Sequence, residues 1–242
     1  MGTADFFFLN PNGIVFGSNA QLNIGGSFIG STAESLQIED GTEFSINDTN
    51  PLLTISVPTG LQFGAGAGNI RVLGEGNGLF LNPDSTVNGS NRPTGLDIPS
   101  GHTLALVGGN LTLNGGNLTA DIGHIDLGAV DDNSFVLLTA NSTGWELDYT
   151  EVETFGNIQF LNAASTDVSG NNAGVISLQG RTITLQDGSS LLAKIAVSGG
   201  GTITVEATES LQMTGTSATT PAAPFTALPT SAYIEIAPVA PN

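Results

Sequence analysis

Gly174-Val175-Ile176-Ser177-Leu178, followed by Thr182-Ile183-Thr184-Leu185, is the stretch that decides the fold of this chain. In both segments aliphatic residues alternate with polar ones, which is the period of a β-strand with one buried face. An Asp187-Gly188 turn separates them from a third short segment at 190–193. Three short strands joined by tight corners are typical of one coil of a β-solenoid. We therefore predict an all-β chain: a right-handed parallel β-helix, a single-stranded solenoid with three short strands per coil.

The first of these segments belongs to a repeat. The unit Gly-x-Ile-x-Φ, in which Φ is apolar, recurs at 68–72, 123–127, 156–160, 174–178 and 201–205. The last three units start about 18 and 27 residues apart, close to the roughly 20 to 30 residues of a solenoid coil. Stacked coils form a continuous core, to which each buried Ile, Leu or Val contributes about 1.5–3 kcal/mol. A β-sandwich is the competing fold, but the repeat and the lack of clear two-residue hairpins favour the solenoid.

The composition excludes several kinds of partner. Of the 242 residues only 11% are charged, and the net charge is −18 with four basic residues, Arg71, Arg92, Arg181 and Lys194. No basic footprint for nucleic acid can be built from these. No apolar run approaches the ~18–20 residues of a membrane span, so we expect no membrane insertion. The chain has no cysteine, which excludes disulfides and thiolate metal sites.

Candidate catalytic and metal-binding residues are scarce. His102 and His124 could stack on one face if a coil were about that long, but without a convergent carboxylate or cysteine they make a poor metal site. Asp126 lies inside a Gly-x-Ile unit, so we expect it on an outward face. The equivalent positions of the other units are Arg71, Gln159, Ser177 and Thr204. That column is not acidic, and we predict no catalytic residue, no metal and no cofactor.

Two local segments have their own interpretations. Trp145 and Tyr149 form either a sugar-stacking patch or an aromatic cap over a gap in the core. The prolines that flank residues 51–58 suggest an edge strand rather than a central one.

A second distinctive motif lies near the start of the chain. An apolar run beginning at Phe6 is interrupted by Asn10-Pro11-Asn12-Gly13 and resumes at Ile14. Proline presets φ at the second position of a tight turn, and Gly13 can adopt the left-handed conformation that closes it. We predict two buried strands joined by this turn.

The motif and its flanks, Leu9–Gly17 followed by Leu22–Phe28, resemble the secretion domain of two-partner-secretion exoproteins, the filamentous-haemagglutinin family. A later segment, 104–109, is similar to the cyanobacterial type of these exoproteins. The resemblance implies a right-handed β-helix exported through the periplasm to the extracellular space or cell surface. It also implies that a cognate outer-membrane transporter of the TpsB type recognises a five-residue signature, here Asn10, Pro11, Asn12, Gly13 and Ile14.

The resemblance also suggests how the chain is organised. We expect residues 1–90 to be the C-terminal part of a TPS or haemagglutinin-type secretion domain, and residues 91–214 to form further β-helix coils. Residues 215–242 should be a Thr/Ala/Pro-rich extended tail in which 233–236 begins another coil. The family's earlier Asn-Pro-Asn-Leu signature and a signal peptide are not seen in the sequence, so we expect an N-terminally truncated fragment.

We therefore predict a non-enzymatic secreted or surface exoprotein fragment that acts as a monomeric adhesin or haemagglutinin. Its receptor would be a glycan or protein of a host or neighbouring cell. A polysaccharide-active β-helix enzyme, of the lyase or hydrolase kind, is one alternative. A passive structural spacer, in which repetition itself is the function, is the other.

Overall fold

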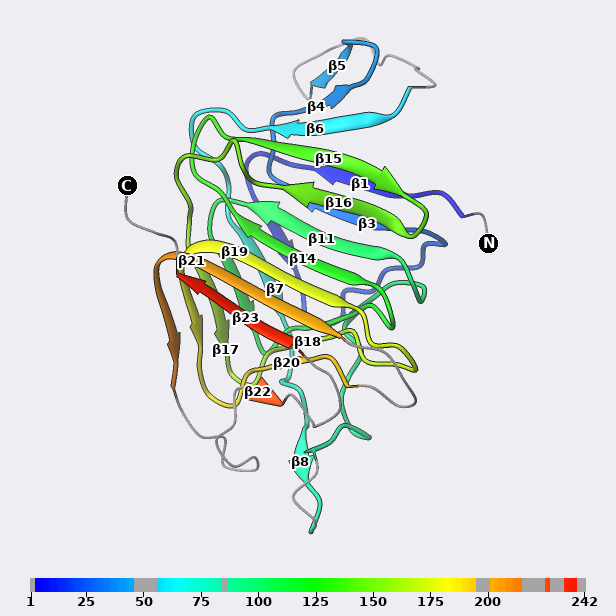
Figure 1. Ribbon diagram of the computed structural model, residues 1–242, viewed down its shortest axis with the longest axis vertical. Coiled ribbons are helices and arrows are strands. Elements are labelled where there is room, and N and C mark those ends of the chain that lie inside the picture. The colour runs from blue at the N-terminus through cyan, green and yellow to red at the C-terminus, as the bar shows by residue number, and fades with distance from the viewer. Residues whose placement is uncertain are drawn as a thin grey trace.

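The computed structural model describes residues 3–45, 56–83, 87–194 and 201–214, together with the backbone of two strands at 225–226 and 233–238. Throughout these residues the chain is all-β, with strands joined by turns and bends and without a helix. Accordingly, no helix in this part of the chain is long and apolar enough to cross a membrane. The strands stack side by side along the molecule, as Figure 1 shows.

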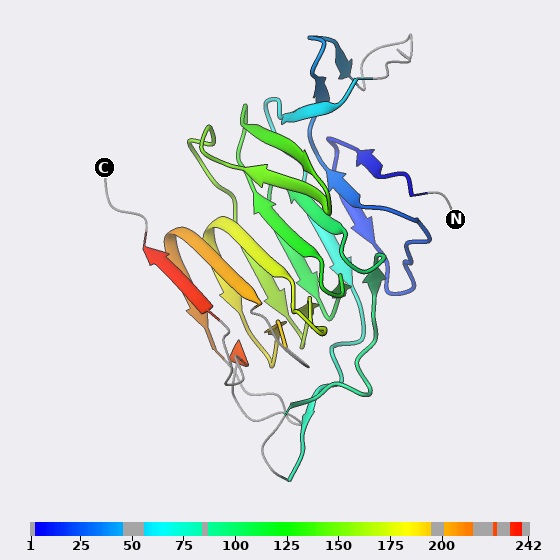
Figure 2. The same ribbon diagram turned by 45° about the vertical axis from the view of Figure 1, so that its right-hand side comes forward.

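The largest sheet is parallel, contains 11 strands and consists of two rows. The first row contains β1 (Phe6–Leu9), β3 (Phe28–Ser31), β11 (Thr103–Gly108), β14 (His124–Ala129), the first parts of β19 (Val175–Leu185) and β21 (Thr202–Met213), and β23 (Tyr233–Pro238). The second row contains β2 (Ile14–Phe16), β7 (Ile70–Leu73), β12 (Leu111–Asn114), β17 (Ile158–Leu161) and the last parts of β19 and β21. The register of β19 and β21 shifts between Gly180 and Thr182, where one row passes into the other and the sheet curls (Figure 2).

A third row of parallel strands forms a separate sheet of five. It contains β10 (Leu96–Asp97), β13 (Asn117–Thr119), β18 (Ser165–Asp167), β20 (Ser190–Leu192) and β22 (Phe225–Thr226). Beside it, β8 (Phe80–Leu81) and β9 (Val87–Asn88) form a small antiparallel pair. Of the expected tail at 215–242, the strands β22 and β23 are described and extend the sheets, and the rest lies outside the described residues.

The inner core fills the space between the three rows. Its side chains come from equivalent positions of successive strands, paired in register, and they are almost completely buried. The first row contributes Phe28, Leu104, Ile125, Ile176 and Ile203, and the second row Ile70, Leu111, Ile158 and Ile183. The Gly-x-Ile units are thus divided between two rows, whereas the sequence analysis placed them at one position of the coil. The strands of both rows have the same alternating pattern, which explains the error.

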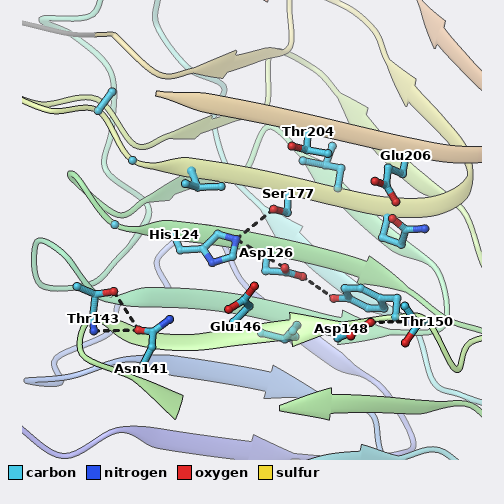
Figure 3. A pocket seen from close by; sticks show the side chains of 18 of the residues that line it. His124, Asp126, Asn141, Thr143, Glu146, Asp148, Thr150, Ser177, Thr204 and Glu206 are labelled. Atoms are coloured by element: carbon cyan, nitrogen blue, oxygen red, sulfur yellow. Dashed lines mark hydrogen bonds and ion pairs between the residues drawn. The ribbon is translucent and has the colours of Figure 1, made fainter. Parts of the chain in front are cut away.

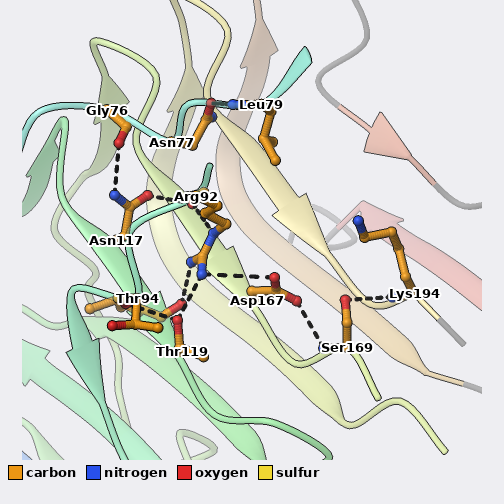
Figure 4. A network of polar contacts seen from close by, with 12 residues as sticks. Gly76, Asn77, Leu79, Arg92, Thr94, Asn117, Thr119, Asp167, Ser169 and Lys194 are labelled. Atoms are coloured by element: carbon orange, nitrogen blue, oxygen red, sulfur yellow. Dashed lines mark hydrogen bonds and ion pairs between the residues drawn. The ribbon is translucent and has the colours of Figure 1, made fainter. Parts of the chain in front are cut away.

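Arg92 holds the third row together on its outer side (Figure 4). Its guanidinium donates to Ser165 Oγ (2.8 Å), Thr119 Oγ1 (2.7 Å) and the Leu118 carbonyl (2.8 Å), and lies 3.8 Å from an Asp167 oxygen. Its side chain is only 5% exposed. A single arginine therefore bridges two neighbouring strands of this row.

An antiparallel sheet covers the outer face of the first row. Its strand order is β16 (Gly144–Asp148), β15 (Phe135–Asn141), β6 (Pro58–Gln62), β4 (Ser35–Ile38) and β5 (Glu43–Ser45). β15 and β16 are joined by a two-residue loop, because Asn141 pairs with Gly144. This hairpin is not predictable from the sequence, since the loop residues Ser142 and Thr143 lack the usual Asn-Gly signal.

The edge strand predicted between the prolines at 51–58 is not tested, because residues 51–55 lie outside the described part of the chain. Pro58 begins the next strand, β6, which pairs with β15 on one side and β4 on the other. Proline is tolerated there because it is the first residue of the strand.

The outer core lies between this antiparallel sheet and the first row. Ile29, Ala105 and Val107 face it from the first row, and all three are fully buried. Trp145 closes it: the indole meets the Phe7 ring edge-on at 5.0 Å, and its Nε1 donates to Asp5 Oδ2 at 2.9 Å. Of the two interpretations of Trp145, the aromatic cap is therefore correct.

Candidate functional site

The predicted signature forms the corner between β1 and β2. Gly13 N donates to the Asn10 carbonyl at 3.0 Å, and Asn12 N donates to Asn10 Oδ1 at 3.2 Å. Gly13 has a φ of 114°, which favours glycine, and Ile14 is 5% exposed and points into the inner core. The predicted turn is confirmed. Asn12 is exposed at its tip, so this corner can be reached by a partner.

The strands on either side of the turn are less buried than predicted. Phe6 is 49% exposed and Phe8 is 39% exposed. Both lie on β1, which pairs only with β3 within the described residues. The strands also do not pair with each other, because β1 belongs to the first row and β2 to the second. The turn is therefore a corner of the stack and not the end of a hairpin.

A groove of about 820 Å³ lies on the outer face of the first row, beside the β15–β16 hairpin. Figure 3 shows His124, Asp126 and Ser177 on its floor, with Glu146 reaching over them from β16. Thr204 and Glu206 of β21 extend the floor on the far side. The lining contains carboxylates, hydroxyls and an imidazole but no lysine or arginine.

The floor of the groove holds a connected set of polar groups. His124 Nε2 is 3.1 Å from Ser177 Oγ and 3.7 Å from Asp126 Oδ2. On its other side Asp126 accepts a hydrogen bond from the Tyr149 hydroxyl. Four side chains from three segments are therefore linked across the base of the groove.

Burial shifts the pKa values of this set. Desolvation lowers the pKa of His124, partly opposed by a hydrogen bond with the Trp145 backbone, so the imidazole is neutral at pH 7. Desolvation raises the pKa of Asp126 to about 7, although the Tyr149 hydrogen bond acts in the opposite direction. The pKa of Tyr149 is raised well above its ordinary value by burial and by the nearby Asp126.

This arrangement does not form a nucleophilic triad. Ser177 and Asp126 both approach the same nitrogen of His124, whereas a triad needs the acid on the nitrogen opposite the nucleophile. Among the described residues no group of three or more His, Asp or Glu is placed to hold a metal ion. The groove can therefore offer hydrogen bonds and negative charge to a ligand.

The positions of these residues agree with the sequence-based expectations only in part. Asp126 does lie on the outward side of its strand, but Tyr149 covers it and leaves it 2% exposed. Its column contains Ser177 and Thr204, whereas Arg71 and Gln159 belong to the second row. His102 and His124 do not stack, because the register partner of His124 is Thr103. The β15–β16 hairpin, which the repeat does not reveal, is what creates the site.

Comparison with known proteins adds one finding about the whole region. The family model described as "TPS secretion domain" matches residues 1–178, which include the signature turn and most of the groove. No curated protein and no solved structure matches the chain.

Proposed function

Because the chain belongs to the TPS secretion domain family, we propose that it is part of a non-enzymatic exoprotein that a TpsB-type outer-membrane transporter exports. Members of this family are two-partner-secretion exoproteins found in the extracellular space or at the cell surface. The match over residues 1–178 is the observation that carries the proposal.

The signature turn is our proposed contact with the transporter. The main support is its accessibility combined with its fixed shape: Asn12 is exposed, while Ile14 is anchored in the inner core. Recognition of such a neutral turn would depend on hydrogen bonds from backbone and amide groups rather than on charge.

After export, we propose that the chain acts in adhesion as a monomer, in the manner of a haemagglutinin. The groove beside the β15–β16 hairpin supports this role, because its hydroxyl and carboxylate groups suit a polar receptor such as a glycan. The segment 104–109, on which the resemblance to cyanobacterial exoproteins rests, forms most of β11.

The three rows support a finer description of the fold as a right-handed parallel β-helix with three strands per coil. We propose that residues 1–90 contain the signature-bearing part and residues 91–214 contain further coils. Since the family match continues to residue 178, we place these coils at least partly within the secretion domain.

Two alternatives are weaker. A polysaccharide-active enzyme would need a pair of carboxylates facing a substrate, yet Asp126 lies beneath Tyr149 and is bonded to it. A passive spacer would not need the groove, although it would need the inner core.

Secretion of the full-length parent with its transporter tests the proposal. We expect Asn12→Ala to lower the amount of protein in the medium, because Asn12 is the exposed residue of the signature. Asn19→Ala is a matched control, since Asn19 is also exposed in a turn but lies outside the signature. Equal secretion of both variants and the parent would contradict the role of the signature, and turnover of polysaccharide by the purified chain would favour the enzyme instead.

A further inference from the structure

The groove beside the β15–β16 hairpin lies where the antiparallel cover of the first row stops. Tyr149, which follows β16, crosses β14 at Gly128, where a methyl group would overlap the phenol ring. The outward residues of the next strands line the groove instead, with Val175 and Ser177 on β19 and Thr204 on β21. The groove therefore joins an inserted wall to a floor made of the repeated strands.

One end of this floor carries an apolar patch. Ile122 is 39% exposed and Val175 is 38% exposed, and both line the groove. Ile122 has a φ of 56°, a left-handed conformation that is costly for a β-branched residue and is found most often at binding sites. Ser177 follows Val175 on the same face of β19, so apolar and hydroxyl surfaces adjoin. A sugar ring presents the same two surfaces, with C–H groups on its faces and hydroxyls around its edge.

The groove also carries negative charge that no neighbouring cation balances. Glu146 stands on the hairpin side and Glu206 on the far side of the floor, as Figure 3 shows. Neither carboxylate has an ion-pair or hydrogen-bond partner within the part of the chain that the structure describes. The lining contains no lysine or arginine, and the lowered pKa of His124 keeps its imidazole neutral at pH 7. An anionic ligand would be repelled here, whereas a cation would be attracted from both sides.

We propose that the groove binds an oligosaccharide whose units carry free amino groups, such as a short glucosamine polymer. The ammonium groups lie at Glu146 and Glu206, and a sugar face packs on the patch formed by Ile122 and Val175. The inference rests on the proposed function and names the class of glycan that its groove takes. The volume of about 820 Å³ is within the ~300–1,000 Å³ of small-molecule sites.

Three trisaccharides with the same linkage separate charge from shape. Isothermal titration calorimetry with the purified chain at pH 7 compares the trimers of glucosamine, N-acetylglucosamine and glucuronic acid, which are cationic, neutral and anionic. We expect the glucosamine trimer to bind about tenfold or more tightly than the acetylated trimer, and the glucuronic acid trimer to bind weakest of all. The preference should shrink as salt is added, because salt screens exposed carboxylates.

Glutamine substitutions test the two carboxylates without changing their shape. Glu146→Gln and Glu206→Gln should each raise Kd for the glucosamine trimer about threefold, and the double variant about tenfold. Glu43→Gln is the matched control, because Glu43 is exposed on β5, at the opposite edge of the antiparallel sheet from β16. It removes the same charge and should leave Kd within about 1.5-fold.

Thr204→Val distinguishes a sugar from a basic peptide. The change removes a hydroxyl from the floor and leaves the charge of the groove as it was. We expect it to raise Kd for the glucosamine trimer about threefold and to leave the weaker binding of a trilysine peptide unchanged. Thermal unfolding of each variant shows that it is folded before binding is measured.

Several results would overturn the inference while leaving adhesion through the groove intact. These are equal affinity for the three trimers, tighter binding of the neutral or anionic trimer, an equal loss of affinity in Glu43→Gln, and tighter binding of trilysine than of the glucosamine trimer. If none of the three trimers binds, the inference fails together with the proposed glycan-binding role of the groove. The proposed export is separate from this outcome, because secretion of the full-length parent tests it.

Discussion

The inner core and the outer core are packed from the same strands by different means. On β11, Leu104 and Leu106 point into the inner core while Ala105 and Val107 point into the outer core, and all four are fully buried. The inner core is built by repetition, because the side chains of each strand pack against those at the equivalent positions of the next strand. The outer core is closed by an inserted antiparallel sheet whose contacts occur once. Repetition spreads stability over many equivalent residues, whereas a unique cover concentrates it in a few.

The comparison predicts the largest effect for large-to-small changes at the centre of each core. Phe160→Ala in the inner core and Trp145→Ala in the outer core should each cost about 3–5 kcal/mol. The first should weaken all strand rows together. The second should release β15 and β16 and leave β12 and β17 protected, because these strands share no core with Trp145. Hydrogen exchange resolved by peptide separates the two patterns, and the same pattern for both variants would show that the cores are one cooperative unit.

Arg92→Met probes the polar contacts on the outer side of the third row. The change removes three hydrogen bonds from a buried guanidinium and leaves Thr119 and Ser165 without this donor. We expect a loss of about 2–3 kcal/mol in urea unfolding. Arg71→Met is the control, since Arg71 is exposed on β7 and should change stability by less than about 0.5 kcal/mol. Similar losses in the two variants would mean that the Arg92 contacts contribute little.

The pH dependence of stability in the Asp126→Asn variant tests what the buried Asp126 carboxyl contributes at the edge of the outer core. Folding raises the pKa of Asp126 from 3.8 to about 7, so its contribution to stability is full below pH 3.8 and is lost as pH rises through 7. The amide has no such charge, and the variant should be more stable than the unaltered chain by up to about 4 kcal/mol at pH 8 and nearly equal to it at pH 4.

His124 acts in the opposite direction, because its lowered pKa makes its contribution present above pH 6.5 and lost as pH falls. Urea unfolding at pH 4, 6 and 8 measures both effects. A pH-independent difference between the Asp126→Asn variant and the unaltered chain would contradict the assignment of the titration to Asp126.

Thr166→Val should have the smallest effect, and we expect a gain in stability. Thr166 is fully buried on β18, and its hydroxyl has no hydrogen-bond partner among the described residues. Valine has the same shape, so the variant should gain about 0.5–1 kcal/mol. Thr119→Val provides the contrast, since it removes the bonds to Arg92 and to the Thr94 carbonyl and should lose stability. Thermal unfolding of the two variants gives the comparison.

The same contrast explains what could be predicted from sequence. Alternation such as Ile70-Arg71-Val72 and Ile158-Gln159-Phe160 predicted strands with one buried face, and the structure confirms it. In these strands one face meets solvent, so polarity follows burial directly. The turn at Asn10–Gly13 was also predictable, because proline and glycine specify its geometry locally.

The outer layer could not be predicted in this way. Ala105 and Asp126 occupy outward positions that would be exposed in a bare stack, and they are buried only because residues 135–149 fold back over them. Nothing in the sequence around Asp126 indicates that Tyr149 will cover it. The groove could not be predicted for the same reason. One side of it consists of the repeated strands of the first row, and the other side is the inserted β15–β16 hairpin.

The chain contains a single tryptophan, and it lies in the outer core against Phe7 and Asp5. Its fluorescence emission therefore reports on the contact between the inserted layer and the first row, while the far-ultraviolet circular dichroism signal sums over every strand. Two optical signals of the unmodified chain already distinguish the two regions: coincident unfolding curves would indicate a single transition, and an emission change that precedes the loss of strand signal would show the cover lifting first.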